Sequence, residues 1–312
     1  MRLRALGKAL PLVSELSLGT WGLSGDAYGP VAEPEQDKVI DRALALGITL
    51  FETADVYGGG AMETKLGQRL PKTVLVATKL GTDRLASPPQ KRFTEAYLRE
   101  AFEKSRERLA RDVVDVVLLH NPVAKTVEAG EATGVMKDLK QQGRIGAWGV
   151  SAGSLQVARA ALAAGAEVLS LTYHVFSAKD LAALHDELTA KGVGVLAHSV
   201  LSHGLLAGFW SLHKEFAPSD HRNERWTPDE LRRRVQQLGV VRPLVGGKVG
   251  SMRAAAMLFA LACPDVCSVV LGPRSTLQLD QLVREGNDEP PYLTPDQLSG
   301  LSARLEQAGA NF

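Results

Sequence analysis

The chain has 312 residues, of which 45% are hydrophobic and 23% charged, and its formal net charge is +1 at pH 7. This composition is typical of a globular protein rather than a disordered chain, and the balanced charge gives no electrostatic footprint for nucleic acid. No apolar run reaches the roughly 18 residues that a membrane span needs. The basic start of the chain is not followed by the apolar stretch of a signal peptide, so we expect a cytoplasmic protein.

Short runs rich in Val, Ile and Leu alternate with amphipathic stretches of helical period along most of the chain. The predicted strands are Leu16–Leu18, Ile48–Phe51, Val74–Ala77, Val113–Leu119, Ile145–Val150, Val168–Thr172, Gly194–Ala197 and Ser268–Leu271. The predicted helices between them include Glu35–Leu46, Glu63–Leu70, Thr94–Leu109, Val127–Gln141, Leu155–Ala163 and Asp180–Ala190.

This alternation predicts a parallel sheet covered by helices. Eight strands with seven helical connections favour a closed (β/α)8 barrel, a TIM barrel, as one domain over residues 1–312; an open, doubly wound sheet is the alternative. Two segments depart from the repeat. The first dozen residues can form a hairpin that caps the barrel floor, and Leu201–Gly250, after the seventh strand, forms a long loop of the kind that often binds ligand.

Polar residues follow directly on several predicted strands, at the carboxyl ends where barrel enzymes carry their catalytic groups. Because successive strands bring these ends around one site, we interpret the residues as a set. The set comprises Glu52, Tyr57, Lys79, His120, Ser151, Thr172–His174 and His198–Ser199.

In this order and spacing, the segments resemble those of the aldo-keto reductase family. The resemblance runs from Leu18 to about Leu282. It is carried by Phe51–Gly58 with its acidic residue and tyrosine, by Ala77–Lys79, Leu118–Pro122 and Gly143–Ser151, and by the turn Gly272–Ser275 with Gln278.

The resemblance implies reduction of a small carbonyl compound by NADPH, or the reverse reaction. Reduction needs a hydride on carbon and a proton on oxygen, and Tyr57 would give the proton. A phenol is a weak acid, so the cation of Lys79 is expected to lower the pKa of Tyr57. Glu52 would hold Lys79 in place, and His120 would bond the substrate oxygen or tune the tyrosine.

The cofactor prediction rests on the turn after the last strand. No Gly-x-Gly-x-x-Gly motif is present, so a Rossmann site has no support. The turn brings backbone amides and Arg274, which suit a phosphate, and by resemblance Arg274 meets the 2′-phosphate and favours NADPH over NADH. The resemblance assigns the rest of the cofactor site to Thr20, Trp21, Ser151, Ser170, His198, Ser199, Leu201, Gly272 and Gln278.

Several positions depart from the family pattern. Glu52 stands where the family usually has aspartate, and Leu282 replaces an asparagine that would read the adenine. Ala152 and Ser170 replace two amides that hold the nicotinamide carboxamide. His198 stands where an aromatic ring often stacks on the nicotinamide, and a histidine there is expected to titrate near neutral pH.

Three other functions are alternatives. Gly149–Gly153 matches Gly-x-Ser-x-Gly after a strand, which predicts a serine hydrolase with Ser151 as nucleophile. The missing amides favour a barrel that senses cofactor without turnover, as the potassium-channel β-subunits are described. A metal-dependent hydrolase would use His120, His174 and His198 at strand ends, but the first strand lacks a His-x-His pair, so we expect no metal.

The substrate and the cysteines complete the predictions. By resemblance Trp21 lines the substrate pocket, and Trp210 or Trp226 can reach it from the long loop, so we expect an apolar or aromatic aldehyde; alternatively, both loop tryptophans only pack the lid. Cys263 and Cys267 are interpreted as two small buried thiols rather than a metal or redox pair.

Overall fold

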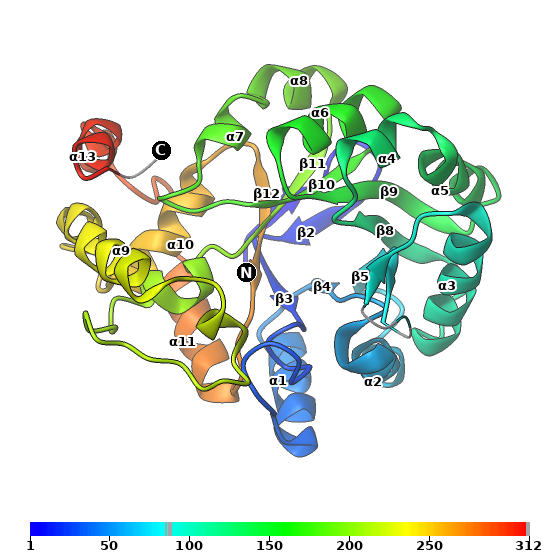
Figure 1. Cartoon of the computed structure of the whole chain (residues 1–312), viewed down its shortest axis with the longest axis horizontal. Coiled ribbons are helices and arrows are strands. Elements are labelled where there is room, and N and C mark those ends of the chain that lie inside the picture. The colour runs from blue at the N-terminus through cyan, green and yellow to red at the C-terminus, as the bar shows by residue number, and fades with distance from the viewer. Residues whose placement is uncertain (85, 87–88, 310–312) are drawn as a thin grey trace.

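The computed structural model describes residues 1–84, 86 and 89–309, and it confirms the (β/α)8 barrel (Figure 1). Eight parallel strands close the barrel, and their order around it follows their order along the chain, so the open-sheet alternative is wrong. They are β3 (Leu16–Gly19), β4 (Leu50–Glu52), β5 (Leu75–Leu80), β8 (Val114–His120), β9 (Ile145–Ala152), β10 (Val168–Thr172), β11 (Gly194–His198) and β12 (Val266–Leu271).

Helices surround the barrel in Figure 1. The α-helices are α1 (Glu33–Ala45), α2 (Ala61–Arg69), α3 (Glu95–Arg108), α4 (Ala124–Glu128), α5 (Glu131–Gln141), α6 (Leu155–Ala164), α7 (Lys179–Ala182), α8 (His185–Lys191), α9 (Pro228–Val241), α10 (Met252–Ala262), α11 (Thr276–Gly286), α12 (Pro295–Leu298) and α13 (Leu301–Gln307). The 3-10 helices are η1 (Tyr57–Gly60), η2 (Ser202–Ala207), η3 (His221–Asn223) and η4 (Arg242–Leu244). The strands outside the barrel are β1 (Leu3–Ala5), β2 (Leu12–Ser14), β6 (Thr82–Asp83) and β7 (Gln90–Lys91).

Two of the predicted helices are each divided in two, so these predictions were wrong. The predicted helix Val127–Gln141 is interrupted at Gly130, whose φ of 86° is left-handed and ends a right-handed helix. The predicted helix Asp180–Ala190 is divided between α7 and α8. Neither change moves a strand end, so neither alters the positions of the predicted site residues.

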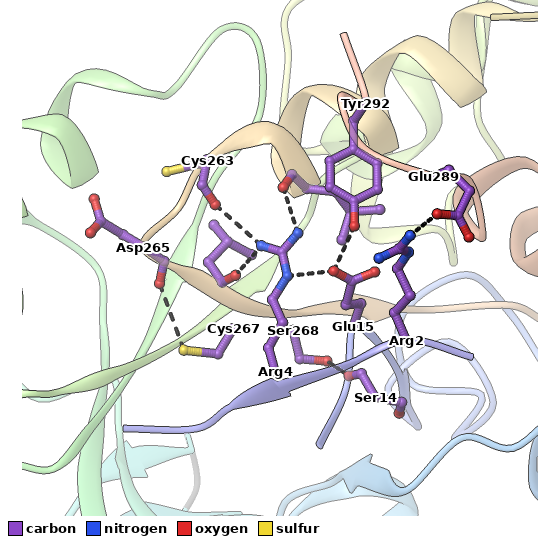
Figure 2. Close-up of polar contacts among 12 residues, drawn as sticks. Arg2, Arg4, Ser14, Glu15, Cys263, Asp265, Cys267, Ser268, Glu289 and Tyr292 are labelled. Atoms are coloured by element: carbon purple, nitrogen blue, oxygen red, sulfur yellow. Dashed lines mark hydrogen bonds and ion pairs between the residues drawn. The ribbon is translucent and has the colours of Figure 1, made fainter. Parts of the chain in front are cut away.

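The predicted hairpin is present at the barrel floor, where β1 pairs antiparallel with β2. Figure 2 shows Arg4 of this hairpin in contact with Glu15 and with the turn between α10 and β12. Its guanidinium donates to Glu15 Oε1 at 2.5 Å and to the carbonyl oxygens of Leu261 and Val266, each at 2.8 Å. The Tyr292 hydroxyl donates to the same Glu15 oxygen at 2.6 Å. The floor is therefore closed by a charged, hydrogen-bonded network rather than by apolar packing alone.

The predicted long loop after β11 contains η2, η3, α9 and η4. It is fastened to the loop after β3, because the His221 N–H donates to the Ala27 carbonyl oxygen at 2.8 Å. Farther along, the Gln237 amide donates to the Ala308 carbonyl oxygen at 2.9 Å, which joins α9 to the last helical segment. Within the described ranges, none of the helices is long and apolar enough to cross a membrane.

Candidate active site

Three of the predicted catalytic side chains meet at the carboxyl end of β4 and β5. Lys79 donates hydrogen bonds to the Tyr57 hydroxyl and to the Thr53 carbonyl oxygen, each at 3.1 Å. It also forms an ion pair with Glu52. The residues Lys79 and Glu52 are only 3% and 4% exposed. A phenol, an ammonium and a carboxylate are thus held in contact away from bulk water.

Tyr57 is positioned by a tight turn directly after it. Gly58, Gly59 and Gly60 have φ values of 60°, 65° and 95°, a left-handed conformation that residues with a Cβ adopt only at a cost. The Gly58 N–H donates to Asp26 Oδ2 at 2.7 Å, which fixes the turn. The phenol ring then lies beside Lys79, whose Nζ is 4.8 Å from the ring centroid.

Burial dominates the electrostatics of Tyr57. Burial raises the pKa of the phenol to about 12, and the Lys79 ammonium opposes this rise only in part. The expected net lowering of the pKa is therefore wrong for the protein alone, although Lys79 acts in the expected direction. Burial lowers the pKa of Lys79, but Glu52 and Tyr57 raise it overall. Tyr57 consequently keeps its proton at neutral pH, and Lys79 keeps its charge.

His120 lies at the end of β8 and faces the tyrosine. Its ring is edge-on to that of Tyr57, with the centroids 6.1 Å apart and an interplanar angle of 85°. Burial, and secondly the charge of Lys79, lower the pKa of His120 well below its usual value, so the imidazole is neutral. Its Nδ1 is buried and has no hydrogen-bond partner among the described residues. Because buried polar atoms are nearly always paired, this nitrogen suits a ligand.

Ser151 and Ser170, assigned by resemblance to the nicotinamide, are direct partners in neighbouring strands. Ser170 Oγ is buried and, within the described part of the chain, has no hydrogen-bond partner. Ser151 Oγ donates to Asn121 Oδ1 at 2.8 Å. Asn121 has a φ of 52° and follows the last residue of β8. The side-chain amide of Asn121 therefore lies next to Ser151, at the end of the neighbouring strand.

His198 and Ser199 lie at the end of β11, where His198 Nδ1 is 3.1 Å from Ser199 Oγ. Burial lowers the pKa of His198 to about 3. The expectation that His198 titrates near neutral pH is therefore wrong, because burial and, secondly, the charge of Lys79 disfavour protonation of the ring. Thr20, after β3, donates its hydroxyl to Thr53 Oγ1 at 2.9 Å.

The aromatic rings of the long loop form a continuous cluster with Trp21. Trp21 lies with its ring centroid 6.3 Å from that of His203, and His203 lies 6.2 Å from Trp226. Trp226 in turn lies 5.8 Å from Trp210. Leu201 packs against the hydrophobic core at the start of this loop. The tryptophans that the sequence singled out therefore belong to one aromatic surface.

The predicted phosphate turn joins β12 to α11. The backbone N–H of Arg274 donates to Gln278 Oε1 at 2.9 Å, so the structure brings these two predicted residues and the adjacent Gly272 together. The Arg274 guanidinium donates to the carbonyl oxygens of Gly29 and Pro30 at 2.9 and 3.0 Å. Its Nε is buried with no partner in the described part of the chain. An arginine and the start of α11 thus lie at this turn, and both are groups that anions bind in proteins.

The model of the aldo/keto reductase family matches residues 15–292, a range that includes every candidate catalytic residue described above. The chain belongs to the aldo/keto reductase family. It is 29% identical to L-galactose dehydrogenase of Arabidopsis thaliana, with 98% of this chain and 95% of that protein covered. It is 31% identical to an uncharacterized oxidoreductase of Mycobacterium bovis, with 86% and 83% covered. The fold matches that of glycerol dehydrogenase from Gluconobacter oxydans with a TM-score of 0.84 at 24% identity, covering 99% and 97% of the two chains.

As an aldo/keto reductase, the chain is an NAD(P)H-dependent oxidoreductase that acts on carbonyl compounds. The serine-hydrolase alternative is wrong: Ser151 lies within β9 rather than on an elbow after a strand, and its hydroxyl bonds Asn121. The described residues contain no group of three His, Cys, Asp or Glu side chains placed to hold a metal. Cys263 and Cys267 form no disulfide and are half-buried, so the expectation of buried thiols is corrected.

Some residues in contact with the strands of the candidate site were not predicted from the sequence. Glu63 in α2 accepts a hydrogen bond from the Thr78 hydroxyl at 2.5 Å and pairs with Arg108 at 2.6 Å. Asp55 is half-buried near them, and desolvation, followed by the charge of Glu63, raises the pKa of its carboxyl to about 7. A glutamate within a helical pattern predicts an exposed side chain, so no signal in the sequence pointed to Glu63. Asn121 could have been found, because it directly follows a candidate catalytic residue.

Proposed function

We propose that this aldo/keto reductase reduces an aldehyde or ketone with NADPH, and that Tyr57 donates the proton. The observation that carries this proposal is the buried contact of Lys79 with both Tyr57 and Glu52. A charged lysine in contact with a phenol stabilises the phenolate that forms when the proton leaves. The edge-on His120 completes a polar pocket for the carbonyl oxygen.

In this proposal the residues divide the work of proton transfer. The reduced nicotinamide supplies the hydride to the carbonyl carbon when it is bound. Tyr57 gives its hydroxyl proton to the carbonyl oxygen, and Lys79 stabilises the phenolate that remains. Glu52 keeps the ammonium charged and oriented. His120 is neutral, so its nitrogen can hydrogen-bond the substrate without placing a second cation beside Lys79.

The described residues fit a nicotinamide cofactor. The unpaired Ser170 Oγ, together with Ser151 and the amide of Asn121, offers partners for a carboxamide. His198, Thr20 and Trp21 lie at the neighbouring strand ends, and Ser199 and Leu201 continue the same rim. At the other end, Arg274 with Gly272 and Gln278 would hold the 2′-phosphate, and this assignment favours NADPH over NADH.

The substrate pocket would be bounded by the aromatic cluster of Trp21, Trp210 and Trp226. Apolar rings favour a substrate with an apolar or aromatic group on the carbonyl. Because one relative is named L-galactose dehydrogenase, a sugar also belongs among the compounds to be tried. The proposal therefore predicts higher kcat/KM for aromatic and branched aldehydes than for acetaldehyde.

The test is a titration followed by a substrate panel. Quenching of tryptophan fluorescence gives the Kd values of NADPH and NADH for the wild type and for Arg274→Ala. The panel then contains aromatic, aliphatic and sugar carbonyls, with NADP+ and L-galactose for the reverse direction. We expect turnover of at least one aldehyde and a loss of about tenfold or more in NADPH affinity on Arg274→Ala, with NADH much less affected. Absence of turnover across the panel, or equal losses for both cofactors, would contradict the proposal.

A further inference from the structure

A carboxylate from α1 is bound at the start of α11, next to the turn that carries Arg274. Glu35 Oε1 accepts a hydrogen bond from the Thr276 backbone N–H at 2.8 Å and from the Thr276 hydroxyl at 3.2 Å. Thr276 is the first residue of α11, so its N–H is one of the amides that a helix leaves unpaired. The Ser275 hydroxyl oxygen accepts a hydrogen bond from another amide of this turn, the Gln278 backbone N–H, at 3.2 Å.

Glu35 lacks an ion-pair partner among the described residues: no lysine, arginine or histidine forms an ion pair with it. The positive end of the α11 dipole and the two Thr276 donors hold it instead. Arg274, the one arginine of the predicted phosphate turn, directs its guanidinium to the carbonyl oxygens of Gly29 and Pro30, in the loop that leads into α1. The segment from Gly29 to Glu35 therefore contacts the turn twice: its Glu35 carboxylate bonds the start of α11, and its Gly29 and Pro30 carbonyl oxygens accept from Arg274.

We propose that Glu35 selects between cofactors: its carboxylate competes with the 2′-phosphate of NADPH for the first turn of α11, and so limits the preference of the enzyme for NADPH over NADH. This inference rests on the proposed function, because it requires that the cofactor lies along the Gly272–Ser275 turn. The phosphate carries up to two negative charges and would be repelled by an uncompensated carboxylate. The 2′-hydroxyl of NADH can instead donate a hydrogen bond to it, as acidic residues accept from a ribose hydroxyl in other dinucleotide sites.

The selection combines attraction and repulsion at one turn. Arg274 favours the phosphate, whereas Glu35 opposes it, and specificity often depends on such a repulsive element as much as on the attractive one. When NADPH binds, the Glu35 carboxylate must either leave the Thr276 amide or remain beside the phosphate and repel it. Removal of the charge at residue 35 should therefore strengthen NADPH binding rather than weaken it, which is the opposite of the effect expected for Arg274→Ala.

The test compares Glu35→Gln with Glu33→Gln, which removes the same charge from an exposed position in the same first turn of α1. Both variants keep an oxygen acceptor at the changed side chain, and thermal melting verifies that they are folded. The measured quantity is the Kd of NADPH and of NADH, by tryptophan fluorescence quenching at low and at physiological salt.

We expect Glu35→Gln to lower the Kd ratio of NADPH to NADH by about tenfold, and Glu33→Gln to leave it within about twofold. Glu35→Asp, which keeps the charge, should retain a ratio near that of the wild type. If both cofactors bind and Glu35→Gln leaves the ratio unchanged, the role of Glu35 is overturned while the proposed function stands. If neither cofactor binds the wild type, the cofactor site and the role of Glu35 are overturned together.

Discussion

Glu52 offers the sharpest test of how the catalytic lysine is held, and the substitution is Glu52→Gln. The change removes the carboxylate that pairs with Lys79 but keeps the length of the side chain and one oxygen acceptor. Both partners are almost completely buried. Removing one member of a buried ion pair costs about 3–5 kcal/mol, because the other charge stays buried without its counter-ion. The remaining amide oxygen and the Thr53 carbonyl oxygen still accept from Lys79, so we expect a loss of about 3 kcal/mol.

The magnitude is measured by urea denaturation of four proteins at pH 7: the wild type, Glu52→Gln, Lys79→Met and the double variant. The double variant leaves neither charge unpaired, so its loss in free energy of unfolding should be smaller than the sum of the two single losses by about 2 kcal/mol. Glu52→Asp, which keeps the charge, should lose less than half as much as Glu52→Gln. Additive single effects, within about 0.5 kcal/mol, would refute the claim that the pair acts as a unit.

The same substitution should change the pH dependence of turnover. Burial lowers the pKa of Lys79, and among the groups that raise this pKa Glu52 has the largest effect. Without the carboxylate, the Lys79 ammonium loses its proton at a lower pH. As the pH is raised, the rate of carbonyl reduction should therefore begin to decline at a lower pH than in the wild type. A pH profile of Glu52→Gln that matches the wild type would show that Glu52 does not set the charge of Lys79.

The remaining predictions concern stability. Arg4→Met leaves the buried Glu15 carboxylate and the carbonyl oxygens of Leu261 and Val266 without the guanidinium. Urea denaturation should therefore show a loss of about 3 kcal/mol in the free energy of unfolding, part of which should be recovered in Arg4→Met/Glu15→Gln. A loss below about 1 kcal/mol would argue against the floor network. Burial raises the pKa of Asp55 to about 7 from 3.8, so the folded state binds this proton more tightly than the unfolded state. Stability should therefore fall as the pH rises from about 4 to 7, by up to about 4 kcal/mol, and Asp55→Asn should remove most of that slope; equal slopes in both proteins would count against the shift.

Much of the fold could be predicted because it depends on local periodicity. Each of the eight predicted strands overlaps a barrel strand, and the residues after them, such as Glu52 and His120, lie at its carboxyl end. The order of strands along the chain was enough to place these side chains near one another. The error at Gly130 has a local cause, because an isolated glycine can lie inside a helix or at its end, and the hydrophobic pattern alone does not distinguish the two.

The parts that escaped prediction depend on contacts between distant segments. Glu35 and Thr276 are 241 positions apart, and nothing in the pattern of α1 indicates that its first turn contacts the cofactor turn. The net pKa of Tyr57 was also misjudged, because the sequence shows the cation of Lys79 but not the degree of burial that outweighs it. His198 failed for the same reason. Burial is a property of the assembled barrel, so electrostatic signs read from neighbouring residue types remain incomplete.

The most direct measurement for the central claim is single-turnover reduction of an aldehyde by Tyr57→Phe, which removes one hydroxyl and keeps the ring beside Lys79 and His120. Loss of a proton donor typically slows such a step by about 10²–10⁴-fold. We predict a loss in that range with the Kd of NADPH changed by less than about twofold, because the hydroxyl contacts Lys79 rather than the cofactor turn. A variant that reduces the aldehyde at nearly the wild-type rate would contradict the assignment of Tyr57 as the proton donor.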